Sequence, residues 1–191
     1  MDNLTETKLT SEKIYSGCIL DFYRDTVRLP NGGTAPRELS RHVGAVCIVP
    51  LLDDGRVIVE RQFRYPVNEV ITEIPAGKRD SRDEAPEAAA RRELREETGL
   101  RLTAITHVLP PAACTVGIGD ERTVCVFGTA EGTFRPSADP MEEIESAWYT
   151  RAQVRALHET EYFVQDEWTA NAHWMLSTGV RTNFSKAFGF M

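Results

Sequence analysis

The segment that ends at Gly99 constrains the fold of this chain more than any other. Pro86 suits the first turn of a helix, and Glu87–Thr98 consists almost entirely of residues that favour helices. Glycine commonly follows a helix C-terminus, because it adopts left-handed backbone angles without strain. The sequence therefore predicts one well-defined helix near the middle of the chain, ending at Gly99.

The predicted helix carries three carboxylates on one edge. Glu93 and Glu97 are four residues apart, and Glu93 and Glu96 are three apart, so all three share a face near the helix C-terminus. The helix dipole and like-charge repulsion each disfavour this placement by roughly a few tenths of a kcal/mol. Two interpretations remain open. The edge is either a solvated face with neighbouring arginines as partners, or a site for a hard cation such as Mg²⁺, which binds through few carboxylates and bridges to substrate phosphates.

Apolar segments on both sides of this helix predict strands. The continuous run Ala45–Leu52 is followed by the turn signal Asp53-Asp54-Gly55 and by Arg56–Gln62, which together predict a hairpin. A capping-box pattern at Thr150–Gln153 predicts the start of a short helix. The other strands are expected at Val70–Ile74, Thr103–Leu109, Arg122–Thr129 and Ile144–Tyr149, and a last helix is expected at Asp166–Thr178.

The first 40 or so residues predict strands that need a partner. Ile14–Ile19, Phe22–Arg28 and Thr34–His42 have strand-like composition, and Pro30–Gly33 is a turn cluster. Three short strands bury too little apolar surface to be stable alone. They are expected to pack on the rest of the chain or on a second copy of it.

Composition excludes several classes of function. A length of 191 residues suits one domain, with or without a small appendage. The net charge of −7 makes nucleic-acid coating a poor fit. The longest apolar run, near Val43–Leu52, is about half of what a bilayer requires, and the polar N-terminus is not a secretory signal. Four widely spaced cysteines are expected to be buried free thiols, which predicts a cytoplasmic protein without structural zinc.

The residues around the helix match a known family pattern. Six residues separate Gly77 from Glu84, and seven residues separate Glu84 from Arg92–Leu100, which has the sequence R-E-L-R-E-E-T-G-L. This pattern resembles the Nudix box, which has five residues between its first glycine and glutamate. The extra residue lies in the turn before the helix, where insertions are tolerated. The resemblance implies the α/β Nudix fold, an α/β/α sandwich with a mixed sheet, here with an N-terminal antiparallel β extension.

Strings outside the box resemble the ADP-ribose pyrophosphatase branch of this family. Arg61–Arg64 is followed by Glu73–Gly77 with the sequence E-I-P-A-G, and Val27–Gly32 with Pro36–Glu38 resembles the N-terminal strands of that branch. The resemblance implies homodimers that use Mg²⁺, with Mn²⁺ as the alternative, and that exchange N-terminal strands between subunits. It predicts a dimerisation region over residues 1–42 and a Nudix hydrolase domain over residues 43–191.

The resemblance also implies roles for individual box residues. Glu93 and Glu97 are expected to ligate the metal ion, and Glu96 to be a further ligand or to hold a water molecule. The backbone carbonyl of Ala76 is expected to complete the shell, and Arg92 to pair with a box carboxylate and orient it. The structural residues of the box are expected to be Gly77, Glu84 and Gly99.

The general base is expected from a loop beyond the box, as in this branch. The matching acidic segment is Ala138–Glu145, in which Glu142 is the first candidate and Glu143 the second. A base has to reach the attacking water, which a mobile loop permits. The alternative interpretation is that these are solvated loop acids.

Three further residues are candidates for substrate binding. Arg37 and Arg64 are expected to grip the diphosphate or the nucleoside, because arginine forms forked contacts with phosphate; a surface ion pair is the alternative for each. Glu73 is expected to contact ribose or an arginine. The loop Ala112–Glu121 stands where this branch carries a substrate loop, but its sequence departs from the usual string, so the sugar preference stays open.

The predicted reaction is hydrolysis of the diphosphate bond of ADP-ribose, or of a related ADP-sugar, to AMP and a sugar phosphate. The alternatives are another nucleotide sugar such as GDP-mannose, a dinucleotide, an oxidised nucleoside triphosphate, or a non-catalytic sensor of ADP-ribose. A complete set of box glutamates disfavours the sensor. The expected partner is therefore a small-molecule nucleotide sugar, with neither nucleic acid nor membrane.

Overall fold

The structure is a computed structural model that describes residues 4–160. It divides into two units. The N-terminal unit comprises the chain up to Val43 together with Ala113–Arg122, and the sandwich unit comprises Gly44–Ala112 and the chain from Thr123 onward. The helix predicted at Asp166–Thr178 lies outside the described residues. No described helix combines the length and the apolar character needed to cross a membrane.

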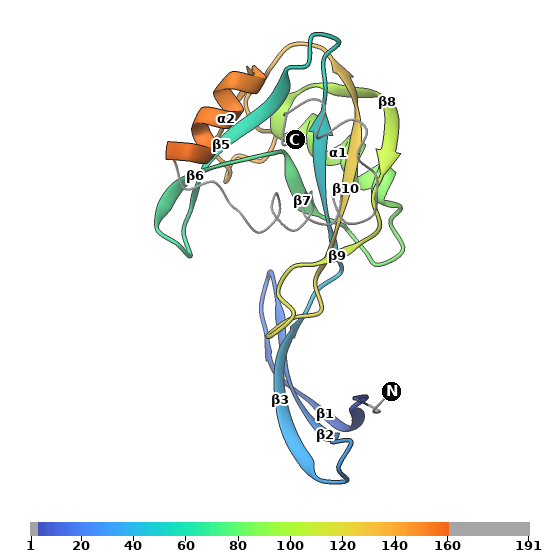
Figure 1. The fold of residues 1–191 in the computed structure, drawn as a ribbon. Coiled ribbons are helices and arrows are strands. Elements are labelled where there is room, and N and C mark those ends of the chain that lie inside the picture. The colour runs from blue at the N-terminus through green and yellow to red at the C-terminus, as the bar shows by residue number, and fades with distance from the viewer. Residues whose placement is uncertain (1–3, 161–191) are drawn as a thin grey trace. The chain divides into compact units, whose positions relative to one another are not determined.

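The N-terminal unit is built on a three-stranded antiparallel sheet (Figure 1). Its strands, in the order β1-β2-β3, are β1 (Thr7–Ser16), β2 (Asp21–Arg28) and β3 (Thr34–Arg41). The predicted strand over Ile14–Ile19 is wrong at both ends. The chain turns after Ser16, where the backbone N–H of Gly17 donates to the carbonyl of Leu20 at 3.0 Å. The strand begins earlier, at Thr7, among polar residues that carry no apolar alternation.

The segment Ala113–Arg122 joins this unit through β3. The backbone N–H of Ser40 donates to the carbonyl of Ile118 at 2.8 Å, and that of His42 donates to Asp120 Oδ1 at 2.7 Å. The loop that the sequence marked as a substrate loop is therefore held against the N-terminal strands, a contact between residues almost 80 positions apart.

The sandwich unit contains two sheets. The first has the order β7-β4-β10-β8, with β9 beside β10, and the second has the order β11-β5-β6. β4 and β10 are parallel, whereas β4–β7 and β8–β10 are antiparallel, so the first sheet is mixed, as predicted. The strands are β4 (Ala45–Pro50), β5 (Val57–Arg64), β6 (Glu69–Glu73), β7 (Ala76–Lys78), β8 (Arg101–Val108), β9 (Ala112–Ala113), β10 (Arg122–Glu131) and β11 (Ile144–Tyr149).

Two helices complete this unit, α1 (Pro86–Thr98) and α2 (Arg151–Thr160). Pro86 occupies the first turn of α1, and Gly99 ends the helix with a φ of 75° while its N–H donates to the carbonyl of Arg95 at 2.9 Å. The capping box that opens α2 also forms, because Thr150 and Gln153 exchange hydrogen bonds between their side chains and backbone N–H groups. Both predicted helix starts are confirmed.

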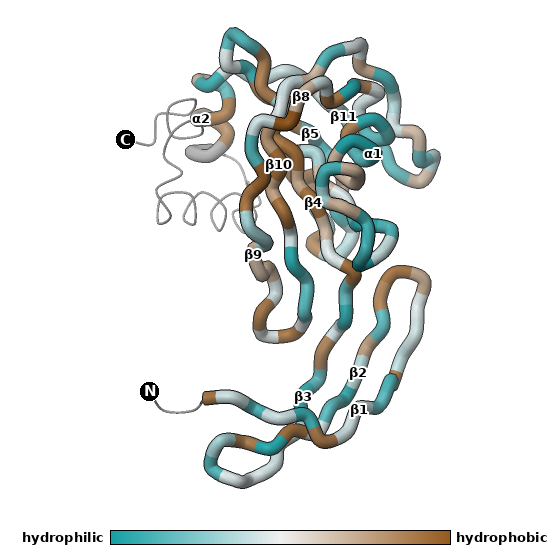
Figure 2. The backbone as a smooth tube through the Cα atoms, turned by 90° about the vertical axis from the view of Figure 1, so that its right-hand side faces the viewer, coloured by the Kyte–Doolittle hydropathy of each residue, from teal (hydrophilic) through white to brown (hydrophobic). Residues whose placement is uncertain are grey.

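Apolar side chains fill both faces of the first sheet. Along β4, Cys47 and Val49 belong to a buried cluster that includes Val154 of α2. Val46 and Ile48 point the other way, into a cluster that includes residues of α1. Figure 2 shows α1 and α2 on opposite sides of the apolar strands β4 and β10. This arrangement confirms the predicted α/β/α sandwich, and it explains why the strand at Ala45–Pro50 is a continuous apolar run.

The cysteines follow the prediction only in part. Cys47 and Cys125 are buried free thiols. Cys18 is exposed and Cys114 is half-buried, and neither forms a disulfide. The prediction is wrong for these two because Cys18 lies in the turn between β1 and β2 and Cys114 lies in the segment after β9, where no core surrounds them.

Candidate active site

Gly77 brings strand β7 against helix α1. It pairs with Val46 of β4, and a Cβ atom at this position would collide with the carboxylate of Glu93. Only glycine therefore allows the side chain of Glu93 to lie directly on the backbone of β7. No strand was predicted here, because three residues of the sequence A-G-K carry no strand signal.

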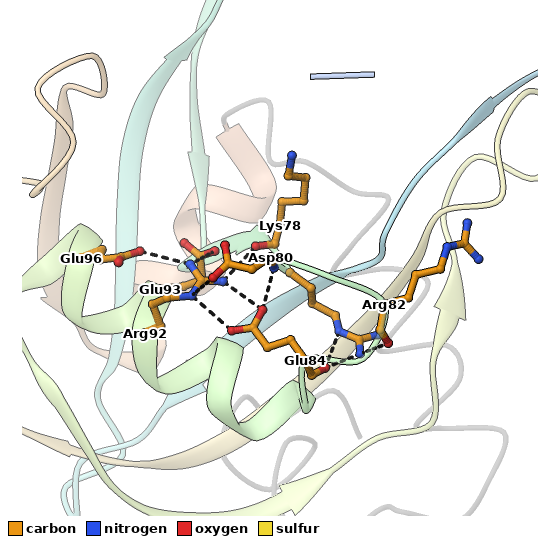
Figure 3. Close-up of polar contacts among 8 residues, drawn as sticks. Lys78, Asp80, Arg82, Glu84, Arg92, Glu93 and Glu96 are labelled. Carbon is orange, nitrogen blue, oxygen red and sulfur yellow. Dashed lines mark hydrogen bonds and ion pairs between the residues drawn. The ribbon is translucent and has the colours of Figure 1, made fainter. Parts of the chain in front are cut away.

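Arg92 connects the helix to the preceding loop (Figure 3). Its Nη1 donates to Glu93 Oε1 at 2.7 Å and to Glu96 Oε2 at 3.2 Å. On the other side, its Nε and Nη2 each donate to Glu84 at 3.2 Å, and Nη2 also donates to the carbonyl of Lys78 at 3.1 Å. The guanidinium thus fixes the carboxylate of Glu93 in one orientation, which is the pairing that the sequence led us to expect.

The loop with the extra residue is closed around Glu84. The backbone N–H of Asp80 donates to Glu84 Oε2 at 2.7 Å, and Arg79 Nε donates to the Glu84 carbonyl at 2.8 Å. The hydrogen bond from Arg92 is the main cause that lowers the pKa of Glu84. The insertion is therefore absorbed within the loop, and Glu84 still reaches Arg92.

Glu97 is a buried carboxylate with an unused oxygen. Its side chain is on α1, only 6% of the residue is exposed, and Oε2 has no hydrogen-bond partner in the described part of the chain. Burial, followed by the charges of Glu60 and Glu93, raises the pKa of Glu97 well above its usual value. Burial also raises the pKa of Glu93, although Arg92 opposes that effect. The protein alone therefore stabilises the charged forms of these two carboxylates poorly.

Glu60 is a site residue that sequence reasoning missed. It is 2% exposed and accepts a hydrogen bond from Ser146 Oγ of β11 at 3.0 Å. Burial raises its pKa to about 7; the bond from Ser146 opposes this shift, and the charge of Glu73 adds to it. The sequence does contain a signal that Glu60 faces the interior, because side chains two apart on a strand share a face. Glu60 therefore shares the face of Ile58, which packs in the cluster that includes α1.

Two of the three predicted substrate-binding residues lie together. Arg64 of β5 and the buried Glu73 of β6 form an ion pair at 2.9 Å. Arg37 belongs to the N-terminal unit, where its guanidinium forms an exposed ion pair with Glu6. Both arginines thus make the ion pairs that were the alternative interpretation, and their contact with substrate stays a prediction.

The acidic loop is attached to the end of α1. The backbone N–H of Ala138 donates to the carbonyl of Glu96 at 2.8 Å, and that of Arg135 donates to the carbonyl of Thr98 at 2.9 Å. Glu142 in this loop lies close enough for its charge to contribute to the raised pKa values of Glu60, Glu93 and Glu97. Glu142 and Glu143 also line a cleft of about 540 Å³, together with side chains of β5 and β6.

The donor set of this site fits a divalent cation. Within residues 4–160, no three acidic, histidine or cysteine side chains converge as a complete cation cage. Mg²⁺ does not need such a cage, because it usually binds through one or two carboxylates and keeps several waters. Glu93 and the unpartnered oxygen of Glu97 supply oxygen ligands of this kind. The expected carbonyl of Ala76 belongs to the residue before Gly77, at the point where β7 meets Glu93.

Comparison with known proteins agrees with this geometry. The model of the NUDIX domain family matches residues 41–172, more than half of the chain. The chain therefore belongs to the Nudix family. A crystal structure of an ADP compounds hydrolase shares the fold with a TM-score of 0.72 at 20% identity, over 91% of this chain and 96% of that one.

Three similar curated proteins are pyrophosphatases of ADP-ribose or ADP-sugars. The chain is 43% identical to the ADP-ribose pyrophosphatase of Bacillus subtilis over 108 residues, which span 56% of this chain and 58% of that protein. It is 36% identical to the ADP-ribose pyrophosphatase of Mycobacterium tuberculosis over 76% of this chain and 71% of that one. The ADP-sugar pyrophosphatase of Mus musculus is 32% identical over 69% and 67%. The resemblance to this branch is confirmed.

Proposed function

We propose that the chain hydrolyses the diphosphate bond of ADP-ribose, or of a closely related ADP-sugar, to give AMP and a sugar phosphate. One observation carries the proposal most directly. Glu97 keeps a buried oxygen without a partner beside Glu93, which Gly77 and Arg92 hold in place. A carboxylate pair of this kind is costly unless a cation joins it. The bound cation would in turn attract the negatively charged phosphates of the substrate, although the protein as a whole is acidic.

Mg²⁺ is the metal we propose, with Mn²⁺ as the alternative. Glu93 and Glu97 would hold it, with Glu96 and the carbonyl of Ala76 as further ligands. When bound, the metal supplies neutralisation of the phosphate charge and a more acidic water. Three oxygen-bearing glutamates and no described sulfur or nitrogen ligand at this edge favour a hard cation over a softer one.

The remaining site residues are proposed to bind the substrate and to move a proton. The forked guanidinium of Arg64, held by Glu73, suits an oxygen pair of the diphosphate. Glu142 is proposed as the general base that takes the proton of the attacking water on its carboxylate, and Glu143 is the second candidate. The cleft that both glutamates line offers space for substrate beside Arg61 and Phe63 of β5.

The N-terminal unit is proposed to hold two subunits together through exchanged strands. Every residue of β1 is exposed, including Leu9, Ile14 and Tyr15, which leaves apolar surface uncovered in the described chain. Sedimentation velocity on the intact protein tests this proposal. A species of about twice the 21.4 kDa chain mass is expected, and a monomer across the micromolar range would contradict it.

A cytoplasmic location is also proposed. The support is chemical: all four cysteines are free, although Cys18 is exposed. Disulfides form in oxidising compartments and are rare in the cytosol. Labelling of Cys18 by a thiol reagent in intact cells that take up the reagent is the expected result.

A substrate panel tests the proposed activity. Phosphate-containing products are measured from ADP-ribose, ADP-glucose, GDP-mannose, NADH and 8-oxo-dGTP, each with Mg²⁺ and with EDTA. Fast cleavage of ADP-ribose that EDTA abolishes is the expected result. Cleavage of another compound alone would keep the metal chemistry and change the substrate. Cleavage of none, together with tight binding of ADP-ribose, would favour the sensor.

A further inference from the structure

The buried carboxylate of Glu60 has no assigned role in the reaction above. It lies on β5 directly opposite Glu73 of β6 on one side and opposite Ser146 of β11 on the other. Like charges directly opposite each other destabilise a sheet. Glu73 has Arg64 as an ion-pair partner, whereas the described contact that holds Glu60 is the neutral hydroxyl of Ser146.

The face on which Glu60 lies points toward α1. Ile58, two residues earlier on β5, packs in the same cluster as Leu94 of α1. Leu94 and Glu97 are buried residues of α1 three positions apart, so both lie on the helix face that meets β5. The oxygen of Glu97 that lacks a partner is buried in this same region. Two carboxylates from different elements thus approach one another in the interior, a costly arrangement for the protein alone.

We propose that Glu60 is a positioning residue that binds the hydration shell of the cation held by Glu93 and Glu97, with Ser146 fixing its carboxylate for that purpose. A direct bond to the metal is not required. Mg²⁺ keeps several waters, and each water donates hydrogen bonds to acceptors around the site. This inference rests on the proposed metal site.

The test compares Glu60→Gln with Glu131→Gln. The amide of glutamine keeps the size of the side chain and still accepts a hydrogen bond from Ser146. Glu131 is an exposed glutamate of β10 that pairs with Arg101, so its variant makes the same chemical change away from the site. Two quantities are measured for each protein at pH 8: the thermal unfolding midpoint in EDTA, and the Mg²⁺ affinity from titration of that midpoint or from competition with Mn²⁺.

The expected result has two parts of opposite sign. Glu60→Gln raises the unfolding midpoint in EDTA by a few degrees, because a buried repulsion is removed. The same variant weakens Mg²⁺ binding about 10-fold, the size typical for loss of an outer-shell partner. Glu131→Gln changes neither quantity. Ser146→Ala, which frees the carboxylate without removing it, weakens Mg²⁺ binding by a smaller factor and covers the case in which Glu60→Gln fails to fold.

Other outcomes separate the two claims. Unchanged Mg²⁺ affinity in Glu60→Gln, or a lower midpoint in EDTA together with unchanged affinity in Ser146→Ala, would overturn the role of Glu60 and leave the metal site intact. Absence of Mg²⁺ binding by the unmodified protein, in the same titration, would overturn the proposed metal chemistry itself.

Discussion

Strands β1 and β4 show how differently the two units of this chain use apolar residues. All ten residues of β1 are exposed, whereas all six residues of β4 are buried. β4 lies between two apolar clusters, one on each face of its sheet, and the described N-terminal sheet has no comparable core. The sandwich unit therefore has an apolar core of its own around which a charged site can be held. The N-terminal unit instead exposes apolar side chains of β1 that could pack against another surface.

This difference also separates two kinds of charged residue. Ion pairs of the N-terminal unit such as Arg37–Glu6 are exposed, and pairs of this kind contribute little to stability. The buried carboxylate of this unit, Asp25, is paired with Arg41. The carboxylates of Glu60 and Glu97 in the sandwich unit are buried, and their pKa values are raised. Perturbed, buried titratable groups are typical of functional sites. The largest functional effects are accordingly expected from the sandwich unit.

The largest expected effect is that of Glu142→Gln. Loss of the proposed base lowers kcat by about 100-fold to 10,000-fold, while KM changes little. Steady-state kinetics on ADP-ribose measures both values, with Glu143→Gln as the matched control in the same loop. If Glu143→Gln shows the loss and Glu142→Gln does not, the base is the neighbouring residue.

The comparison of cores predicts a difference in stability. Ile48→Ala, in a side chain that is fully buried against α1, lowers the free energy of unfolding by about 2–5 kcal/mol. Leu9→Ala, on the exposed face of β1, lowers it by less than about 1 kcal/mol within one chain, and weakens self-association instead. Urea denaturation at two protein concentrations separates these effects. If the two variants lost similar amounts of unfolding free energy at both concentrations, the proposed difference between the units would be wrong.

A third expected effect comes from the contact between β7 and α1. Gly77→Ala places a methyl group where the carboxylate of Glu93 lies, so the carboxylate moves and kcat/KM falls about 100-fold, as for a misplaced group of roughly 1 Å. Gly55→Ala is a suitable control, because its Cβ meets nothing within 4 Å although its positive φ adds some strain. Full activity of Gly77→Ala would show that Glu93 does not need this position.

The smallest expected effect tests whether the N-terminal unit touches substrate at all. Arg37→Gln raises KM for ADP-ribose about 10-fold with little change in kcat, if its guanidinium contacts a phosphate, since charged hydrogen bonds contribute about 1.5–3 kcal/mol. Glu6→Gln removes the ion pair but keeps the arginine, and it should leave KM unchanged. Equal behaviour of the two variants would limit Arg37 to a structural role.

Much of the sandwich could be predicted because its signals are local. Pro86 and Gly99 mark the ends of α1, and the unbroken apolar run from Ala45 indicates a strand covered on both faces. β7 escaped prediction because three residues carry no periodicity and its position depends on pairing with β4. The attachment of Ala113–Arg122 to β3 likewise depends on contacts between residues far apart in sequence.

The site divides in the same way. The box glutamates and Arg92 share one helix or its preceding loop, so their spacing alone places them together. Glu60 comes from a different element and is typical, in sequence, of a solvent-facing strand residue. Its burial follows from the packing of β5 between β6 and β11 and toward α1. Alternation along β5 groups Glu60 with the apolar Ile58, but its place beside Glu73, Ser146 and α1 depends on how the strands and the helix pack.

The most direct test of the proposed chemistry is turnover of ADP-ribose by the unmodified protein and by Glu97→Gln, each in EDTA and after excess Mg²⁺ is added, with circular dichroism as the check on folding. We predict that the unmodified protein is inactive in EDTA and recovers with Mg²⁺, and that Glu97→Gln stays folded and inactive in both conditions. Turnover by Glu97→Gln at the unmodified rate, or turnover that EDTA does not affect, would contradict a metal site at Glu93 and Glu97.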